Sequence, residues 1–338
     1  MVERAEFTSY YGRPIVKKPV WKWPVPAYFF TGGLAGGSSL LGFGGAVTGN
    51  WRLARHGRRA GFVAILASTA FLIEDLGRPE RFLNMMRVFK PSSPMSMGSW
   101  TLMLYGPTAG LAVVTDILHG AAHFPARGGA KRRPWVHALA RSRLLDRVSF
   151  LGEIAAGLSG IGVASYTAVL VTDTSVPVWY AARRELPFVF VGSSMAASGG
   201  LAAVVNPAAD CAPARRMAVL GSALELVASD VSRRRMRAGP VDVGEVYEQG
   251  RAGRLERLSQ ALTVAGAVLT GVVGRRRGPA AVGGALLVGG SLAKRFAVYE
   301  AGMQSADDPT YTVGPQQARA AGLSEPPGRA RGGRPARR

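Results

Sequence analysis

The sequence predicts an all-α integral membrane protein, a bundle of about eight transmembrane helices. Eight stretches of the 338-residue chain are apolar and long, and a helix needs about 20 mostly apolar residues to cross the hydrocarbon core. Charged residues make up 19% of the chain but are concentrated between these stretches. Because backbone polar groups in lipid must be hydrogen-bonded internally, helices are expected rather than open strands.

The expected spans follow one another with short connections. In order, they are 26–49, 58–76, 98–119, 148–172, 186–205, 213–229, 257–274 and 278–296. The sixth and seventh are shorter than the others and are included partly because an even total is expected. The first and fourth are rich in glycine at three- and four-residue spacing, which lets helix backbones approach closely in lipid. We find no clear internal repeat.

Three regions are expected along the chain. Residues 1–25 form a polar, basic, proline-bearing segment, which does not have the pattern of a cleavable signal. Residues 26–304 form the membrane domain. Residues 305–338 form a basic tail rich in Gly, Pro, Arg and Ala, whose last dozen residues are expected to be disordered.

The formal charge of +21 and the isoelectric point of about 11.2 raise the question of nucleic-acid binding. The arginines, however, stand in short blocks beside the apolar stretches, as in Arg233, Arg234 and Arg235. Such blocks are typical of contacts with lipid headgroups and of topology signals. We therefore expect a multi-pass protein of the plasma membrane, in contact with the bilayer and not with nucleic acid. Both faces carry many cations, so the charge pattern leaves the orientation open.

The sequence offers few ligands for a redox cofactor. Cys211 is the single cysteine, which excludes a disulfide framework, a cysteine-ligated iron–sulfur cluster and a structural zinc site. No histidine lies inside an apolar stretch, and His119 only ends the third, so paired axial imidazoles for haem are not expected. The chain is predicted to bind neither haem nor an iron–sulfur cluster, and electron transfer would need a ligand or a partner chain.

With eight spans, both termini and the second, fourth and sixth connections share one face of the membrane, here called face A. The opposite face is face B. On face A, residues 74–100 and 177–187 mix charges of both signs with Pro, Gly and aromatic residues. This pattern favours a structured docking surface, and the alternative is an ordinary belt of aromatic residues at headgroup depth.

Charged residues at membrane depth are costly and tend to be paired, protonated or functional. Glu225 lies within the sixth stretch and is a candidate for a proton path. Asp116 and Glu153 lie near face B, where solvated helix ends are expected. Lys294 and Arg295 end the last stretch and are expected to snorkel or to pair.

Four segments of the sequence resemble the NrfD/PsrC family of quinone-reactive membrane subunits. They are Trp21-x-Trp23 with Tyr28-Phe29-Phe30-x-Gly32-Gly33, then Leu76-Gly77-Arg78-Pro79 with Ser93-Pro94-Met95-Ser96-x-Gly98-Ser99-Trp100, then Ser165-Tyr166-Thr167 with Pro177-x-Trp179, and Arg295-Phe296 through Asp308-Pro309. The segments occur in family order over roughly residues 21–310.

The resemblance implies an eight-helix subunit without a bound redox metal, with a quinone pocket near the face that docks a ferredoxin-like subunit carrying [4Fe-4S] clusters. A third, molybdopterin-type catalytic subunit is also implied. Tyr166 matches a tyrosine that hydrogen-bonds a quinone oxygen, and Tyr28 stands about where relatives can carry a histidine. Because a phenol with a pKa near 10 exchanges protons poorly at neutral pH, proton exchange is expected to need a carboxylate, and Glu74, Asp75 and Asp173 are the nearest candidates on face A. The expected docking residues are Arg78, Pro79, Ser93, Pro94, Trp100 and Trp179.

The leading hypothesis is a subunit without the catalytic centre, which exchanges electrons between the iron–sulfur partner and menaquinone or ubiquinone. One alternative is a membrane anchor without a working quinone site. A secondary transporter is the other, but it would predict broken helices and inverted repeats, and the sequence shows neither. The partner's substrate, the direction of electron flow and any proton pumping are not set by this sequence.

Overall fold

The computed structural model describes residues 15–78, 80–123, 142–239 and 241–320. These residues are almost entirely helical and include no strand. Eight of the helices are long: α1 (Pro24–Val47), α2 (Trp51–Asp75), α4 (Pro94–His123), α6 (Arg143–Thr172), α8 (Leu186–Val205), α9 (Ala212–Arg237), α10 (Gly250–Val268) and α11 (Arg277–Asp307). The predicted all-α membrane fold is confirmed.

Short elements connect or end the long helices. They are α3 (Arg81–Asn84), α7 (Pro177–Ala181), the 3₁₀ turns η1 (Ala208–Cys211) and η2 (Val243–Tyr247), the π-helical turn η3 (Leu269–Val273) that continues α10, and α12 (Thr310–Ala320). Each expected span overlaps one long helix in the expected order.

Four helices of the described part are long and apolar enough to cross a membrane by length and composition: α4, α6, α8 and α11. The count of eight crossings therefore stays a prediction. Two of the remaining helices contain arginine blocks that we expected in the connections. Helix α2 begins at Trp51 and so includes Arg55, and α9 continues through Arg233 to Arg237. These blocks are helical, not loops.

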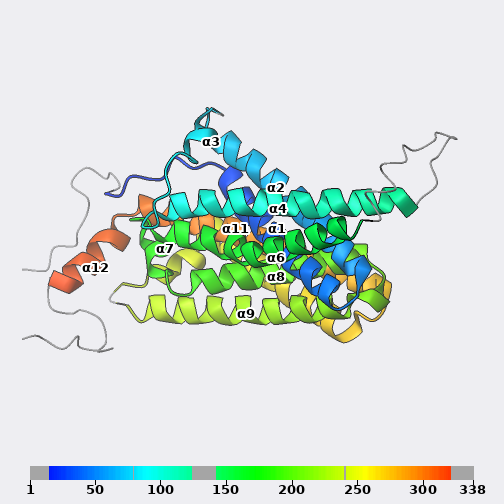
Figure 1. The fold of residues 1–338 in the computed structure, drawn as a ribbon. Helices are drawn as coiled ribbons and strands as arrows, with labels where there is room; N and C mark the ends of the chain where they lie inside the picture. The colour runs from blue at the N-terminus through cyan, green and yellow to red at the C-terminus, as the bar shows by residue number, and fades with distance from the viewer. Residues whose placement is uncertain (1–14, 79, 124–141, 240, 321–338) are drawn as a thin grey trace, which may run out of the picture.

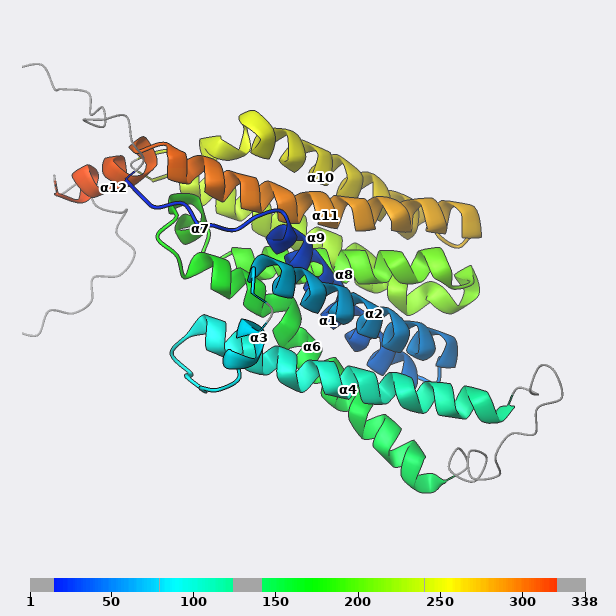
Figure 2. The ribbon, with the colours of Figure 1, turned by 90° about the horizontal axis from the view of Figure 1, so that it is seen from above.

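Helix α1 lies at the centre of the bundle, in contact with α2, α6, α8 and α11. Figure 2 shows α4 and α6 on one side of α1 and α2, with α8 to α11 on the other. The backbones of α1 and α6 come very close where Gly36 faces Gly160, because a Cβ on Gly36 would collide with the Gly160 carbonyl oxygen. This is the role of small residues that the glycine spacing predicted.

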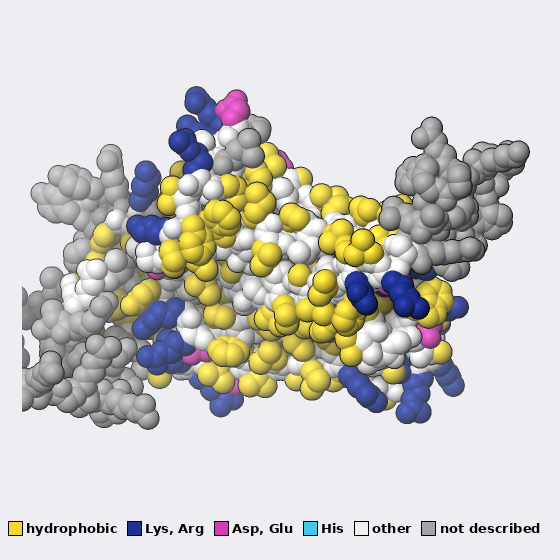
Figure 3. Space-filling view, in the orientation of Figure 1, with side chains coloured by type: hydrophobic (Ala, Val, Ile, Leu, Met, Phe, Trp, Pro, Cys, Tyr) yellow, Lys and Arg dark blue, Asp and Glu magenta, His cyan; other side chains and the backbone are white. Residues whose placement is uncertain are grey.

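The elements assigned to face A gather at one end of the bundle, as expected (Figure 1, left). There the Tyr299 hydroxyl donates to the Trp21 carbonyl oxygen at 2.6 Å, and Lys18 pairs with Asp307. Helices α3, α7 and α12 lie at the same end. Exposed apolar side chains cover the middle of the molecule, and lysines and arginines gather toward both ends (Figure 3).

The residues on both sides of the boundary expected at residue 304 are helical, because α11 continues to Asp307 and α12 follows it, and the division into three regions stays a prediction. The expected tail is thus helical at its beginning. The dozen residues expected to be disordered, and the first 14 residues of the expected N-terminal segment, lie outside the described residues.

Candidate functional site

Tyr28 of α1 and Tyr166 of α6 contact each other on the face-A side of the bundle. Their rings meet edge to face, with centroids 6.5 Å apart. The Tyr28 side chain is buried, and its hydroxyl has no hydrogen-bond partner in the described part of the protein. A buried hydroxyl normally has a partner, so this one is free to donate to or accept from a ligand.

Helix α4 forms the third wall around this pair. Gly98 lies directly against Tyr166, and a Cβ at Gly98 would collide with the ring. The Ser68 hydroxyl of α2 donates to the Tyr28 carbonyl oxygen at 3.3 Å, which fixes the first turns of α1 beside α2. Residues far apart in the sequence therefore position the two phenols together.

Two of the expected carboxylates lie at the end of α2, toward face A. Glu74 is exposed, whereas Asp75 is partly buried and accepts a 3.4 Å hydrogen bond from the Lys22 backbone N–H. In the described residues, no hydrogen bond joins either carboxylate to Tyr28 or Tyr166. The structure thus brings the two phenols together, whereas the Asp75 carboxylate lies beside Lys22, just before the first residue of α1.

The segment from Arg78 to Trp100 protrudes at face A above α4. Arg78 is exposed, Ser93 and Pro94 are partly buried, and Pro79 lies outside the described residues. Trp100 is 37% exposed, packs edge to face on Phe89 and donates from Nε1 to the Val88 carbonyl oxygen at 3.3 Å. The segment is held by such local contacts while offering exposed apolar side chains, namely Val88, Phe89, Met95 and Met97.

Trp179, which was expected on the docking surface, is a core residue. Its side chain is 0% exposed, stacks on Trp21 at 5.4 Å and donates from Nε1 to the Val298 carbonyl oxygen at 2.7 Å. Gly302 leaves the space that the indole fills. The expectation of docking was wrong for this side chain. The segments around Trp21 and Val298 pack against the indole and bury it inside the protein, where no partner subunit can contact it.

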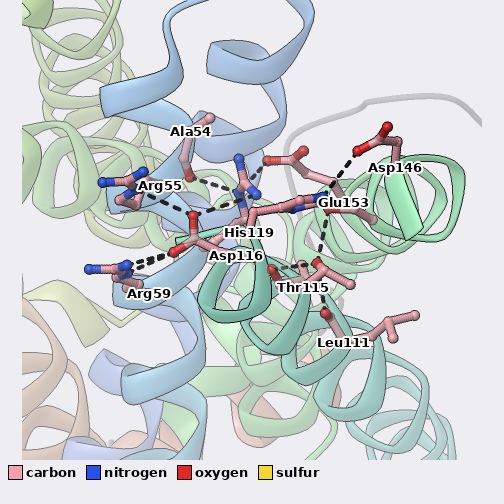
Figure 4. A network of polar contacts seen from close by, with 12 residues as sticks. Ala54, Arg55, Arg59, Leu111, Thr115, Asp116, His119, Asp146 and Glu153 are labelled. Carbon is pink, nitrogen blue, oxygen red and sulfur yellow. Dashed lines mark hydrogen bonds and ion pairs between the residues drawn. The ribbon is translucent and has the colours of Figure 1, made fainter. Parts of the chain in front are cut away.

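The acids near face B are buried and paired, not solvated as expected. Asp116 of α4 accepts two hydrogen bonds from the Arg59 guanidinium of α2, at 2.9 and 2.7 Å (Figure 4). Glu153 of α6 lies 3.0 Å from Arg58 Nε. Arg55 also approaches Asp116, at 3.4 Å. The arginine block of α2 thus joins α2, α4 and α6 through ion pairs.

Glu225 belongs to a second buried ionic group, in which Lys294 binds Glu256 more closely than Glu225. The Lys294 ammonium is 4.0 Å from Glu225 Oε1 and 2.6 Å from Glu256 Oε1. Arg233 also binds Glu256, at 3.1 Å. Sequence reasoning missed Glu256 because this residue precedes the expected seventh span. A signal was present, since Lys294 and Arg295 lie at the end of the last span and buried cations need acidic partners.

Comparison with known proteins identifies the family. A family model described as polysulphide reductase, NrfD, matches residues 15–211, which is more than half of the chain. The match includes α1 to α8, and with them both phenols and the Arg78–Trp100 segment, but not the resembling segment after Arg295. Comparison with curated proteins found no match. The chain belongs to the NrfD polysulphide reductase family, whose members are membrane subunits of quinone-interacting oxidoreductase complexes.

Proposed function

We propose that this chain exchanges electrons between a docked [4Fe-4S] ferredoxin-like subunit and menaquinone or ubiquinone, within a complex whose catalytic subunit is of the molybdopterin type. The observation that carries the proposal is the contact between Tyr28 and Tyr166, with the Tyr28 hydroxyl left without a partner. The family match supports a quinone as the ligand of this site, because the matched region includes both Tyr28 and Tyr166.

The chemistry of the two phenols fits a quinone. A quinone presents carbonyl oxygens that accept hydrogen bonds, and a phenol can donate one. Tyr166 is only partly buried, so a ring arriving from the lipid can meet it first, while the fully enclosed Tyr28 hydroxyl completes the site. In this proposal the bound quinone supplies the redox chemistry, and the chain binds it, orients it and separates it from water.

Proton exchange needs a group that titrates more readily than a phenol. Asp75 is better suited than Glu74, because Asp75 is partly buried and lies beside the first residues of α1, whereas Glu74 faces solvent. We propose that Asp75 exchanges protons between face A and the quinone site through water.

The partner is proposed to dock on the Arg78–Trp100 segment at face A. This segment combines exposed cations with exposed apolar side chains, a composition that suits a protein interface better than lipid alone. It also connects α2 to α4, two of the helices that surround the phenols. A cluster held there would lie on the same side of the membrane as the quinone site.

The test is purification of the complex from native membranes in mild detergent, with identification of the co-purifying chains and of extracted quinone. We expect a ferredoxin-like iron–sulfur protein, a molybdopterin-type subunit and bound quinone. Recovery of the iron–sulfur partner without quinone would favour a membrane anchor. A chain that purifies alone and without quinone would contradict the proposal.

A further inference from the structure

Four fully enclosed ionisable side chains meet among α9, α10 and α11, away from the phenol pair. Glu225 and Arg295 are 0% exposed, Lys294 is 1% exposed and Glu256 is 4% exposed. Burying charges in a membrane protein is costly unless they are paired or have a function. We therefore compare the partners of these four groups to infer which of them carries a proton or a function.

Glu256 is hydrogen-bonded to three side chains through Oε1, although its Oε2 has no partner in the described residues, and Glu225 is bound less well than that. Glu256 Oε1 accepts from Lys294 at 2.6 Å, from Gln260 at 2.7 Å and from Arg233 at 3.1 Å. The Ser193 hydroxyl of α8 lies close to the Glu225 carboxyl group but does not reach good hydrogen-bonding geometry, and the nearest cation, Lys294, is 4.0 Å away. A carboxyl group in this position is much less costly when it carries a proton.

Arg295 does not neutralise Glu225 by direct contact. Its guanidinium lies 3.7 Å above the Phe190 ring and donates from Nη2 to the Phe190 carbonyl oxygen at 2.8 Å and to Ser194 Oγ at 3.0 Å. Helix α8 contributes no charged group beside Glu225, only hydroxyls such as Ser193, which is bonded to Ser291. The charged groups around Glu225 are thus Lys294 and Arg295 on α11, Glu256 on α10 and, further toward face A, Arg233 on its own helix.

A small cavity of about 20 Å³ lies between this cluster and face A. Its lining includes Ser229, Ser232, Arg233, Tyr247, Glu256 and Lys294. Glu225 does not line it, and Lys294 is the lining residue that also approaches Glu225. Its volume is sufficient for one water molecule, and its hydroxyl and charged groups give that water partners. Arg233, whose side chain is 25% exposed, extends from the cavity toward solvent.

We propose that Glu225 is a proton-binding site that exchanges with water at face A through this cavity, with Lys294 as the mobile counter-ion. When the O–H bond of the Glu225 carboxyl breaks, a water molecule that has moved past Lys294 from the cavity accepts the proton and carries it back toward face A. The Lys294 ammonium then turns from Glu256 toward the new carboxylate, while Arg233 and Gln260 keep their hydrogen bonds to Glu256 Oε1. Uptake of a proton reverses these movements.

The proposal stands apart from the proposed quinone function. The aromatic side chains of Phe190 and Phe29, with ring centroids 6.0 Å apart, lie between Arg295 and the Tyr28 ring. No polar chain of described residues joins the two sites. The proton site can therefore be tested in the purified complex without added quinone, and a failure of either proposal leaves the other untouched.

The experiment is infrared difference spectroscopy of the complex during pH steps, in H₂O and in D₂O. We expect a protonated-carboxyl band that decreases as the pH rises, is lost in Glu225→Gln and shifts in frequency in Glu225→Asp. The Glu225→Asp variant keeps an acid in place and serves if Glu225→Gln fails to fold. Tyr28→Phe and Tyr166→Phe should leave the band unchanged.

The route is tested by filling the cavity. Ser232→Leu should slow hydrogen–deuterium exchange of the Glu225 carboxyl several-fold, whereas the control Val227→Leu, on the exposed side of the same helix, should not. A carboxyl band that persists in Glu225→Gln, or no titrating band in the wild-type complex, would overturn the proton site. Unchanged exchange in a folded Ser232→Leu variant would overturn the route through the cavity.

Discussion

The rings of Tyr28 and Tyr166 meet edge to face, with centroids 6.5 Å apart, although they belong to α1 and α6. The contact exists because α1 lies between α2 and α6 at the centre of the bundle and because Gly98 of α4 leaves room for the Tyr166 ring. This arrangement places one phenol at the edge of the protein and one inside it.

Replacing either phenol by phenylalanine should weaken quinone-linked turnover without preventing assembly. Loss of one hydrogen bond costs about 0.5–1.5 kcal/mol, so Tyr166→Phe should lower kcat/KM for the quinone or quinol about 2- to 10-fold. Tyr105→Phe is the matched control. Its hydroxyl donates to the Ala35 carbonyl oxygen at 2.8 Å, so this variant should lower thermal stability and leave the turnover per folded complex intact. Equal turnover of Tyr166→Phe and wild type would count against the role of Tyr166.

Reversing the charge at Arg78 should release the iron–sulfur partner from the membrane. Arg78 is exposed at face A, where the partner is proposed to dock, and Arg78→Glu would repel acidic groups of that partner. The fraction of the partner that sediments with membranes measures the effect. Arg216→Glu, also an exposed position but near the face-B end of α9, should retain it. If the partner stays fully bound to membranes in both variants, docking on the Arg78–Trp100 segment is contradicted.

Trp179 should act through stability and not through docking. Truncation of a fully buried indole that also donates a hydrogen bond costs about 3–5 kcal/mol, so Trp179→Ala should strongly lower the unfolding temperature in detergent. Trp100→Ala, at a 37% exposed position, should change it little. Comparison of the melting curves of the two variants tests whether Trp179 is a core residue. A small loss in Trp179→Ala would mean that the indole is not in the core.

The ion pairs near face B should be strongly coupled. Removing one partner of a buried pair leaves the other uncompensated and costs about 3–5 kcal/mol, so Arg58→Met alone should be poorly stable. The double variant Arg58→Met with Glu153→Leu should recover much of that loss. A double-mutant cycle on unfolding temperatures gives the coupling, and simple additivity would show that the pair contributes nothing.

Cys211 should react slowly with maleimide in the folded protein. Burial raises the pKa of its thiol, so the reactive thiolate is scarce at neutral pH, and the side chain is 0% exposed. The labelling rate should rise with pH and should increase sharply after unfolding in dodecyl sulfate. Mass spectrometry of the labelled chain provides the measurement. Rapid labelling of the native protein at pH 7 would show that η1 opens at face B.

The sequence predicted the helices well because a long apolar stretch has few alternatives in lipid. It placed Tyr28 and Tyr166 at the same end, because alternate crossings and the family resemblance agreed. It did not show which side of a helix meets which neighbour. For that reason the burial of Trp179 was missed, and Asp116 was expected at a solvated end although Arg59 binds it from α2.

Helix ends were also harder to predict than helix centres. Arginine-rich turns look like connections, yet in α2 they stay helical because their side chains pair with acids on α4 and α6. The partner of Lys294 was missed for the same reason, since Glu256 stands in the first turns of α10, before the apolar stretch begins. Ion pairs between helices depend on which side of each helix faces its neighbour, and the length of an apolar stretch does not predict that orientation.

Photoaffinity labelling of the purified complex with an azido-quinone tests whether quinone binds between α1 and α6. Peptides containing Tyr28 and Tyr166 should be labelled, excess natural quinone should prevent the labelling, and Tyr166→Phe should weaken it. Labelling confined to other helices, or the same weak labelling with and without competing quinone, would contradict a quinone site between α1 and α6.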